Sequence, residues 1–240
     1  MTILEIENLI ARHGLLTAVQ EVSLTVGRGE VLGVVGANGA GKTTLFRTIS
    51  GVHPMTSGTI ALEGQSIAGL TASRRVAAGI AMVPEGRRLF SDMTVRENLQ
   101  VAGENGRIGS WNLDSVLGAF PALKPLLRVP AGGLSGGQRQ SVAIGRALMS
   151  NPLVLLLDEV SLGLSPVAVE ELYQSLGALK SARETTMIVV EQDLDRAMAF
   201  SDRIVCMLEG RVALEGAPSA LGKSAITDAY FGLGREMADA

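Results

Sequence analysis

The segment GANGAGKT, residues 36–43, contains three glycines and ends in a lysine and a threonine, in the spacing G-x-x-x-x-G-K-T. It follows the apolar run EVLGVVG, which predicts a buried strand, and it precedes a predicted helix that begins near Lys42. Glycines at these positions let backbone N–H groups wrap around phosphate oxygens, and a helix N-terminus adds a positive dipole. The segment is therefore predicted to bind the phosphates of a nucleotide.

The two polar side chains of this segment have separate expected roles. Lys42 is expected to reach the β- and γ-phosphates, and the hydroxyl of Thr43 is expected to bind Mg²⁺. The residues expected to contact the nucleotide here are Gly36, Ala37, Asn38, Gly39, Ala40, Gly41, Lys42, Thr43 and Thr44.

The segment LVLLLDE, residues 153–159, is an apolar run that ends in two carboxylates. Such a run is typical of a strand buried on both faces of a parallel sheet. Asp158 is predicted to bind the magnesium ion, and Glu159 to orient or deprotonate the attacking water. Successive strand residues point to opposite faces, so the two carboxylates need not crowd one ion. Without the glycine-rich segment, two solvated acids at a strand end would be the simpler interpretation.

The segment LSGGQ, residues 134–138, is a second glycine-rich candidate for anion binding, with a predicted helix from about Gly137 to Met149 behind it. The chain has one strand end of the LVLLLDE type, so this second site lacks a metal site of its own. We therefore expect it to serve the ATP of another molecule, in a head-to-tail pair of two copies or of a copy and a paralogue. The residues expected to contact that nucleotide are Ser135, Gly136, Gly137 and Gln138.

Strand and helix patterns alternate along the rest of the chain. The first 30 or so residues predict short strands joined by turns, and IAMVPE, residues 80–85, predicts a strand that ends in a carboxylate. From about residue 88 to 149 the pattern is mainly helical, and a further helix begins at Pro166 after a serine N-cap. This alternation indicates an α/β fold with a mostly parallel sheet and an inserted helical block.

The segment IVVEQD, residues 188–193, predicts a buried strand that ends abruptly in three polar side chains. In open α/β sheets, ligands bind beyond the carboxyl ends of the strands. The polar groups at this strand end are therefore expected in the same region as the γ-phosphate.

The composition of the 240-residue chain fits an ordinary globular protein, with 47% apolar and 19% charged residues. The net charge of −3 provides no electrostatic reason to expect nucleic acid as a partner. Cys206 has no histidine near it in sequence, so it is interpreted as a buried apolar residue in a strand. No signal peptide or apolar run long enough to cross a bilayer is visible, so any membrane role is expected to depend on a partner.

GANGAGKT, LSGGQ and LLLDE, in this order, resemble the ATP-binding subunits of ABC transporters over essentially the whole chain. The resemblance implies one ATP-binding domain over residues 1–240, with a RecA-like P-loop NTPase core and an N-terminal antiparallel β subdomain. It also implies a helical subdomain, roughly residues 88–149, that is inserted in the core and carries LSGGQ. The implied activity is ATP hydrolysis coupled to transport, with ATP and Mg²⁺ as ligands.

The same resemblance implies partners and a location. They are a second ATPase subunit, two membrane permeases and, indirectly, an external solute-binding protein, at the cytoplasmic face of the inner or plasma membrane. VPEGRRLF, GRALMSNP, SLGLSP and VVEQ are similar to the ATPases of branched-chain amino-acid importers, and most of all to the second ATPase of that system. The ATPases of urea and short-amide importers share much of this pattern and remain an alternative.

Three positions expected at the nucleotide differ from the common family pattern. Gln192 stands where most members have a histidine that contacts the γ-phosphate, and its amide donates a hydrogen bond without a positive charge. We expect Glu159 to supply the main catalytic function and Gln192 to sense the γ-phosphate. Glu85 replaces a glutamine and is expected to contact the metal, the alternative being a surface acid. His13 replaces an aromatic residue that stacks on adenine, the alternative being an exposed loop histidine.

Two further substitutions lie after Glu159. Val160 replaces a proline that often follows this glutamate, and Ser165 replaces an aspartate that usually contacts the partner subunit, the alternative for Ser165 being a helix cap. Two further functions remain open. A soluble ABC protein acting on ribosomes or DNA usually carries two ATPase units or long inserted arms, which this chain lacks. A regulatory subunit with weak hydrolysis is disfavoured by Glu159 but left open by the missing histidine.

Overall fold

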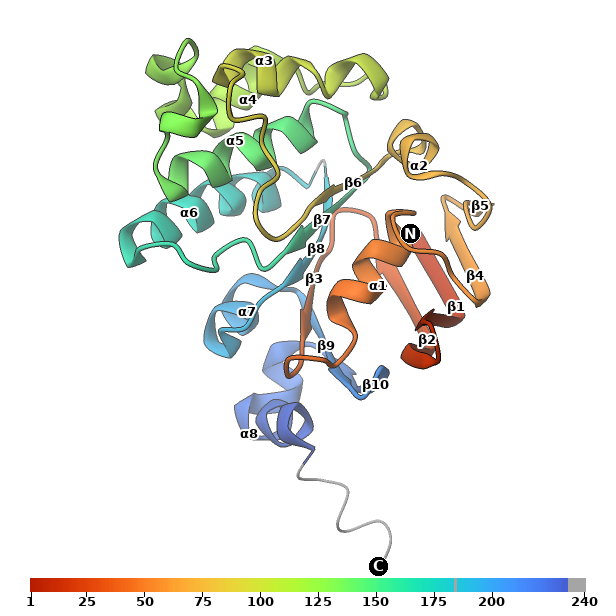
Figure 1. Cartoon of the computed structure of the whole chain (residues 1–240). Coiled ribbons are helices and arrows are strands. Elements are labelled where there is room, and N and C mark those ends of the chain that lie inside the picture. Colours follow the sequence, from red (N-terminus) through yellow and green to blue (C-terminus); the bar gives the residue numbers. More distant parts are fainter. Residues whose placement is uncertain (184, 233–240) are drawn as a thin grey trace, which may run out of the picture.

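The computed structural model describes residues 1–183 and 185–232, and its centre is a six-stranded sheet in the order β10-β9-β3-β8-β7-β6 (Figure 1). Neighbouring strands from β9 to β6 are parallel, and β10 is an antiparallel strand at the edge. This arrangement confirms the predicted α/β fold. The strands are β3 (Val31–Val35), β6 (Ile80–Val83), β7 (Val154–Asp158), β8 (Thr186–Val190), β9 (Arg203–Leu208) and β10 (Arg211–Gly216).

A second, antiparallel sheet in the order β2-β1-β4-β5 forms the N-terminal part of the molecule, as expected. Its strands are β1 (Thr2–His13), β2 (Leu16–Gly27), β4 (Ser57–Leu62) and β5 (Gln65–Ser66). Helix α1 (Lys42–Ile49) lies between the two sheets (Figure 1), and its side chains Leu45, Phe46 and Ile49 are buried in the core that the sheets share. This shared core holds the start of α1 in a constant position relative to the parallel sheet.

The chain between β6 and β7 forms the helical block above the sheet in Figure 1. Pro121 and Pro125 lack an N–H group, and the segment that contains them, Pro121–Leu126, forms a 3₁₀ turn. The helices α5 and α6 (Pro166–Ala182) pack together and close a second core over the parallel sheet. The block contains α3 (Val95–Gln100), α4 (Leu113–Ala119) and α5 (Gly136–Leu148), with 3₁₀ turns at Gly103–Asn105, Pro121–Leu126 and Ala131–Gly133.

The remaining helices are α2 (Ala72–Ala78), α7 (Leu194–Phe200) and α8 (Pro218–Phe231). The start of α6 is as expected, because the hydroxyl of Ser165 accepts a hydrogen bond from the N–H of Ala168 at 3.4 Å. The strand expected over residues 80–85 is shorter, since β6 ends at Val83 before a proline that cannot donate to a ladder. Within the described part of the chain, no helix combines the length and the apolar character needed to cross a bilayer.

Candidate active site

The turn between β3 and α1, residues 36–43, is termed the phosphate loop, and it encloses the side chain of Lys42. Lys42 is 5% exposed, and its Nζ donates hydrogen bonds to the carbonyl oxygens of Gly36 at 2.6 Å and Ala37 at 3.0 Å. Burial lowers the pKa of this lysine, and the nearby carboxylates Glu159 and Asp158 oppose that shift. The loop therefore holds a cation close to Asp158 at the end of β7 and Glu159 directly after it.

Gly41 shows why the phosphate loop requires glycine. Its φ is +98°, and a Cβ atom there would lie 2.2 Å from the carbonyl oxygen of Ala18 on β2. A side chain would therefore both strain the backbone and push the loop away from the antiparallel sheet. Gly41 is also the N-cap of α1, and it offers no side chain to the first N–H groups of the helix. These N–H groups are suited to an anion such as phosphate.

Asp158, the last residue of β7, is a buried carboxyl group with one unsatisfied oxygen. Its Oδ1 accepts a hydrogen bond from the hydroxyl of Thr43 at 3.5 Å, and its Oδ2 has no partner among the described residues. Burial raises the pKa of Asp158 to about 6, with further contributions from Glu159 and Glu85. A buried oxygen without a donor, beside a hydroxyl and other carboxylates, fits a hard divalent cation.

The protein side chains at this place do not enclose a metal by themselves. Over residues 1–183 and 185–232, no three His, Cys, Asp or Glu side chains converge on one point that could hold a metal ion. Mg²⁺ is usually bound through one or two carboxylates together with phosphate oxygens and water. The donor set of Thr43, Asp158 and Glu85 is therefore compatible with a magnesium ion that is bound together with a nucleotide.

Glu159 and Gln192 follow the ends of neighbouring strands and contact each other. The Nε2 of Gln192 donates to Oε2 of Glu159 at 2.8 Å, and the N–H of Glu159 donates to the carbonyl of Val190 at 3.1 Å. Glu159 has a φ of +49°, so the chain turns sharply directly after β7. The structure thus brings both predicted catalytic residues together, with the amide of Gln192 facing the carboxylate of Glu159.

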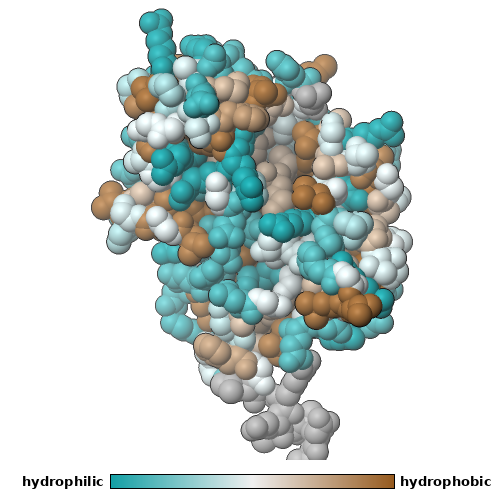
Figure 2. Space-filling view, viewed as in Figure 1, coloured by the Kyte–Doolittle hydropathy of each residue, from teal (hydrophilic) through white to brown (hydrophobic). Residues whose placement is uncertain are grey.

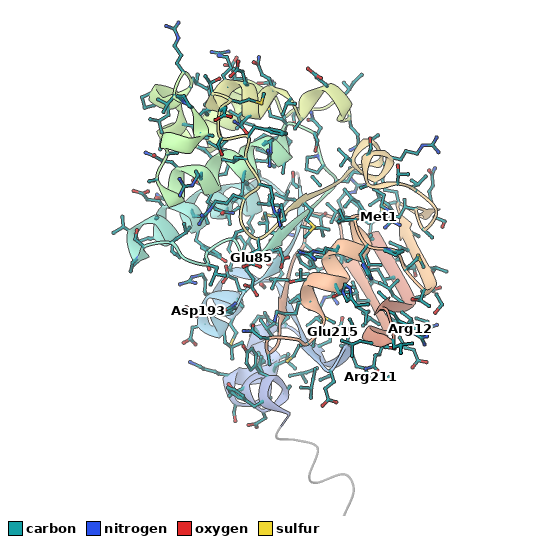
Figure 3. All side chains as sticks on the ribbon, in the orientation of Figure 1. Met1, Arg12, Glu85, Asp193, Arg211 and Glu215 are labelled. Carbon is teal, nitrogen blue, oxygen red and sulfur yellow. The ribbon has the colours of Figure 1, made fainter. Side chains whose placement is uncertain are left out.

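Glu85 lies on the loop after β6, on the side of the molecule that faces the viewer in Figure 3. This loop is attached to α5, because Arg146 donates to the carbonyls of Arg87 at 3.1 Å and Arg88 at 2.9 Å. The Nε of Arg87 also donates to Oε1 of Gln140 on α5 at 3.0 Å. The position of Glu85 is therefore coupled to the helix that begins at the LSGGQ segment.

The LSGGQ segment, residues 134–138, lies at the start of α5 and not beside the phosphate loop (Figure 1). The hydroxyl of Ser135 accepts from the N–H of Gln138 at 3.3 Å, and Oε1 of Gln138 accepts from the N–H of Ser135 at 2.9 Å. This capping box starts α5 at Gly136, one residue earlier than expected. The structure therefore does not bring these four residues to the nucleotide site of their own chain.

His13 is exposed at the end of β1 and lies close to α1. Its Nε2 is 3.1 Å from Oγ1 of Thr44, and its ring centroid is 4.4 Å from that of His53, with the planes tilted by 40°. One face of the His13 ring is therefore near another imidazole. Stacking of His13 on adenine stays a prediction.

Two residues near this site received no role from the sequence. Glu191 is buried directly after β8, and Tyr173 on α6 donates a hydrogen bond to its carboxylate. The sequence indicated only that Glu191 follows an apolar strand, and a charged residue that is buried there needs hydrogen-bonding partners. The identity of those partners was not predictable, because they come from different elements.

Comparisons with known proteins agree on one family. A family model described as ABC transporter matches residues 19–161. The chain is similar to the high-affinity branched-chain amino acid transport ATP-binding protein BraG of Pseudomonas aeruginosa, with 40% identity over 95% of this chain and 99% of the relative. It is 32% identical to the corresponding protein BraF of the same organism, over 96% of this chain and 98% of BraF. A dimeric ATP-binding cassette bound to ADP and Pi matches with a TM-score of 0.78 and 25% identity, over 89% of this chain and 98% of that one.

Proposed function

The chain belongs to the ABC transporter family, and we propose that this ATP-binding, ATP-hydrolysing subunit energises the import of branched-chain amino acids. The amino-acid substrate is supported by the similarity to BraG, which extends over nearly the full length of both chains. The observation that carries the catalytic part is the meeting of Lys42, Glu159 and Gln192 at one edge of the parallel sheet. Residues 1–240 are proposed to act as one ATP-binding unit, with residues 88–149 as its helical subdomain.

In the proposed reaction, water attacks the γ-phosphorus of ATP held by the phosphate loop, and the bond from that phosphorus to the β–γ bridging oxygen breaks, so that ADP and phosphate are formed. Lys42 and the N–H groups at the start of α1 stabilise the negative charge that develops on the phosphate oxygens. The carboxylate of Glu159 orients the water and accepts its proton, while Gln192 holds that carboxylate in place through the 2.8 Å hydrogen bond. Gln192 has a second amide hydrogen with which it can sense the γ-phosphate.

The metal-binding residues of the proposed site are Thr43, Asp158 and Glu85. Mg²⁺, when bound with the nucleotide, would neutralise charge on the β- and γ-phosphate oxygens. The unsatisfied Oδ2 of Asp158 supports this assignment, because a buried oxygen without a donor is otherwise unfavourable.

The second ATPase subunit is proposed to pair head to tail with this chain. In such a pair, Ser135, Gly136, Gly137 and Gln138 would contact the nucleotide on the partner's phosphate loop. The position of the LSGGQ segment away from the phosphate loop of its own chain supports this proposal (Figure 1). The matching dimeric cassette supports a pair, and the similarity to both BraF and BraG favours a paralogue as partner.

The permeases are proposed to dock in a groove of about 310 Å³ between α2, β6, α5 and the turn that follows α3. Its lining is mainly apolar, with residues such as Val83 and Ala143, and Arg87 and Arg146 contribute positive charge. Figure 2 shows a pale brown, hollowed strip between the two upper lobes of the molecule. A short cytoplasmic helix of a permease fits an apolar groove of this kind. Docking there would place the chain at the cytoplasmic face of the membrane and would act on the loop that carries Glu85.

The central test is Glu159→Gln in the complex purified from native membranes. This variant is expected to bind ATP normally and to lose ATPase activity by about 100-fold, because the amide cannot accept a proton. Retention of more than half of the activity would remove Glu159 from the proposed role.

The partners and the substrate are tested in the same preparation. Two permeases, a second ATPase and a binding protein for leucine-like solutes are expected to accompany the wild-type chain. A urea- or amide-binding protein in their place would support the alternative importer. Purification of the chain with ribosomes or DNA, and without permeases, would contradict a role in transport.

A further inference from the structure

Glu191 is the buried carboxylate at the carboxyl end of β8. It is 2% exposed, and its backbone N–H donates to the carbonyl of Val34 at 3.4 Å. Its Oε1 accepts a hydrogen bond from the hydroxyl of Tyr173, and its Oε2 accepts one from the hydroxyl of Ser161 at 2.8 Å. Arg196 on α7 lies 3.8 Å from the same Oε2 and donates to Oγ of Ser161 at 3.3 Å. Three different elements therefore converge on this one side chain.

The position of Ser161 connects this cluster to the proposed catalytic residues. Ser161 lies two residues after Glu159, and Glu191 lies one residue before Gln192. Three hydrogen bonds consequently join residues 159–161 to residues 190–192. They run from the N–H of Glu159 to the carbonyl of Val190, from the amide of Gln192 to the carboxylate of Glu159, and from the hydroxyl of Ser161 to the carboxylate of Glu191.

We propose that Glu191 is a positioning residue for ATP hydrolysis, which holds the turn at residues 159–161 against the end of β8. This proposal rests on the proposed function, in which Glu159 and Gln192 act on ATP. Through Ser161, the carboxylate of Glu191 keeps Glu159 at hydrogen-bonding distance from Gln192. Glu191 itself faces Tyr173 and Ser161 and does not take part in the chemistry.

The chemistry of the cluster suits this task. An ionised carboxylate only accepts hydrogen bonds, so the hydroxyls of Tyr173 and Ser161 are both directed toward it. Burial raises the pKa of Glu191, and the hydrogen bonds from Tyr173 and Ser161 act against that rise. Burial also raises the pKa of Tyr173, so this hydroxyl remains a donor under physiological conditions. Because Glu159 adopts a left-handed backbone conformation, its turn depends on such external contacts.

A buried acid at this position lowers the folding stability, so a purely structural role would be better filled by an apolar side chain. A buried carboxylate loses the solvation of water, and an apolar side chain after β8 would avoid that loss. The geometry of Glu191 offers a compensating function, since it links α6, the turn at residues 159–161 and the residue before Gln192.

The test compares Glu191→Gln with Ser161→Ala and with the double variant, in the purified transporter complex. Each single variant is expected to lower kcat about tenfold and to change the KM for ATP less than twofold, because the phosphate loop is untouched. The double variant is expected to be no slower than the slower single variant, since both changes remove the same link. Tyr173→Phe, which spares the Ser161 link, is expected to lower kcat less than threefold.

The matched control is Asp202→Asn, at the opposite end of the parallel sheet. Asp202 accepts the N–H of Val31 at 2.9 Å and pairs with Lys180 at 2.9 Å, so its loss is expected to lower Tm without changing kcat. A kcat within twofold of wild type for folded Ser161→Ala or Glu191→Gln would overturn the proposal. Multiplying effects in the double variant would also overturn it. Ser161→Ala retains the buried carboxylate with Tyr173, so it decides the question even when Glu191→Gln does not fold.

The Glu159→Gln variant separates this inference from the proposed function. When Glu159→Gln abolishes activity and Ser161→Ala does not, only the role of Glu191 is wrong. When Glu159→Gln remains active, the proposed catalytic assignment itself is wrong.

Discussion

The molecule contains two glycine-rich segments that each precede a helix, and they are built differently. In the phosphate loop, Gly36, Gly39 and Gly41 have φ values of +150°, +84° and +98°, and no side chain caps α1. In the LSGGQ segment, Gly136 and Gly137 are ordinary helical residues, and Ser135 and Gln138 form a capping box. The first segment wraps around the side chain of Lys42, whereas the second forms a capped helix start.

This difference supports the different roles proposed for the two segments. The phosphate loop surrounds its own cation, Lys42, and lies beside Asp158 and Glu159, so it has the parts of a complete site. The LSGGQ segment carries its polar groups on a helix end without a lysine or a carboxylate in the segment. A capped helix end of this kind can add hydrogen bonds to a phosphate that another subunit already holds.

The largest expected effect follows from removing the cation of the phosphate loop. Lys42→Met should reduce ATPase activity about 1000-fold, because the charge on the phosphate oxygens loses its nearest positive group. The measurement is steady-state phosphate release by the purified complex. If the variant kept more than a tenth of the wild-type rate, the phosphate loop would not have the catalytic role proposed for it.

The next effect concerns Asp158 and includes a pH dependence. Asp158→Asn should reduce Mg²⁺-dependent ATPase activity roughly 500-fold, since the ion loses an anionic ligand. The same variant should stabilise the metal-free protein above pH 6. Burial raises the pKa of Asp158 from 3.8 to about 6, so the folded state holds a proton that the unfolded state releases between these values.

The raised pKa of Asp158 makes the metal-free protein less stable as pH rises. The contribution of Asp158 to the free energy of unfolding falls as pH rises from about 4 to about 6, by roughly 3 kcal/mol, and stays low above that. Thermal unfolding in EDTA at pH 4 and pH 7.5 checks it, with the Tm advantage of Asp158→Asn expected at pH 7.5. An equal advantage at pH 4 would contradict the raised pKa.

Gly137→Ala should affect the second segment and spare the first. A Cβ atom at this position would lie 2.9 Å from Cβ of Ala168, so α5 must shift relative to α6. We expect a decrease of about 100-fold in the ATPase activity of the assembled complex and unchanged binding of ATP by the isolated chain. Gly133→Ala is the control, because a Cβ atom there meets only Val129 at 3.9 Å. Weakened binding of ATP by the isolated Gly137→Ala chain would contradict the separation of the two segments.

The smallest expected effect distinguishes the helix cap from the phosphate contact. Ser135→Ala and Ser165→Ala each remove a serine N-cap, and each should cost about 1 kcal/mol of folding free energy. Only Ser135→Ala should also lower ATPase activity, by about tenfold, because only that hydroxyl is predicted to meet a partner's nucleotide. Chemical denaturation and ATPase assays of both variants provide the comparison. Equal ATPase activities of the two variants would mean that Ser135 acts only as a helix cap.

The sequence by itself determined the family, the fold class and the segments around the nucleotide site. Each of these depends on residues that are adjacent along the chain, such as a strand followed by a glycine-rich turn and a helix. The expected helix starts near Lys42 and at Pro166 were also confirmed, since N-terminal turns and caps are local features. The end of β6 was predicted two residues too far, because the sequence run does not show where the ladder stops.

Only the tertiary structure decided which side chains meet. Gln192 faces Glu159, which lies 33 residues away in sequence, and Glu191 accepts from Ser161, which lies 30 residues away. The loop that carries Glu85 is held by Arg146 through carbonyls 58 and 59 residues earlier. Such contacts depend on the order of strands in the sheet and on the packing of α5 and α6, and no local pattern specifies either. The sequence thus defines the chemical groups of the site, and the packing of distant elements defines their orientation.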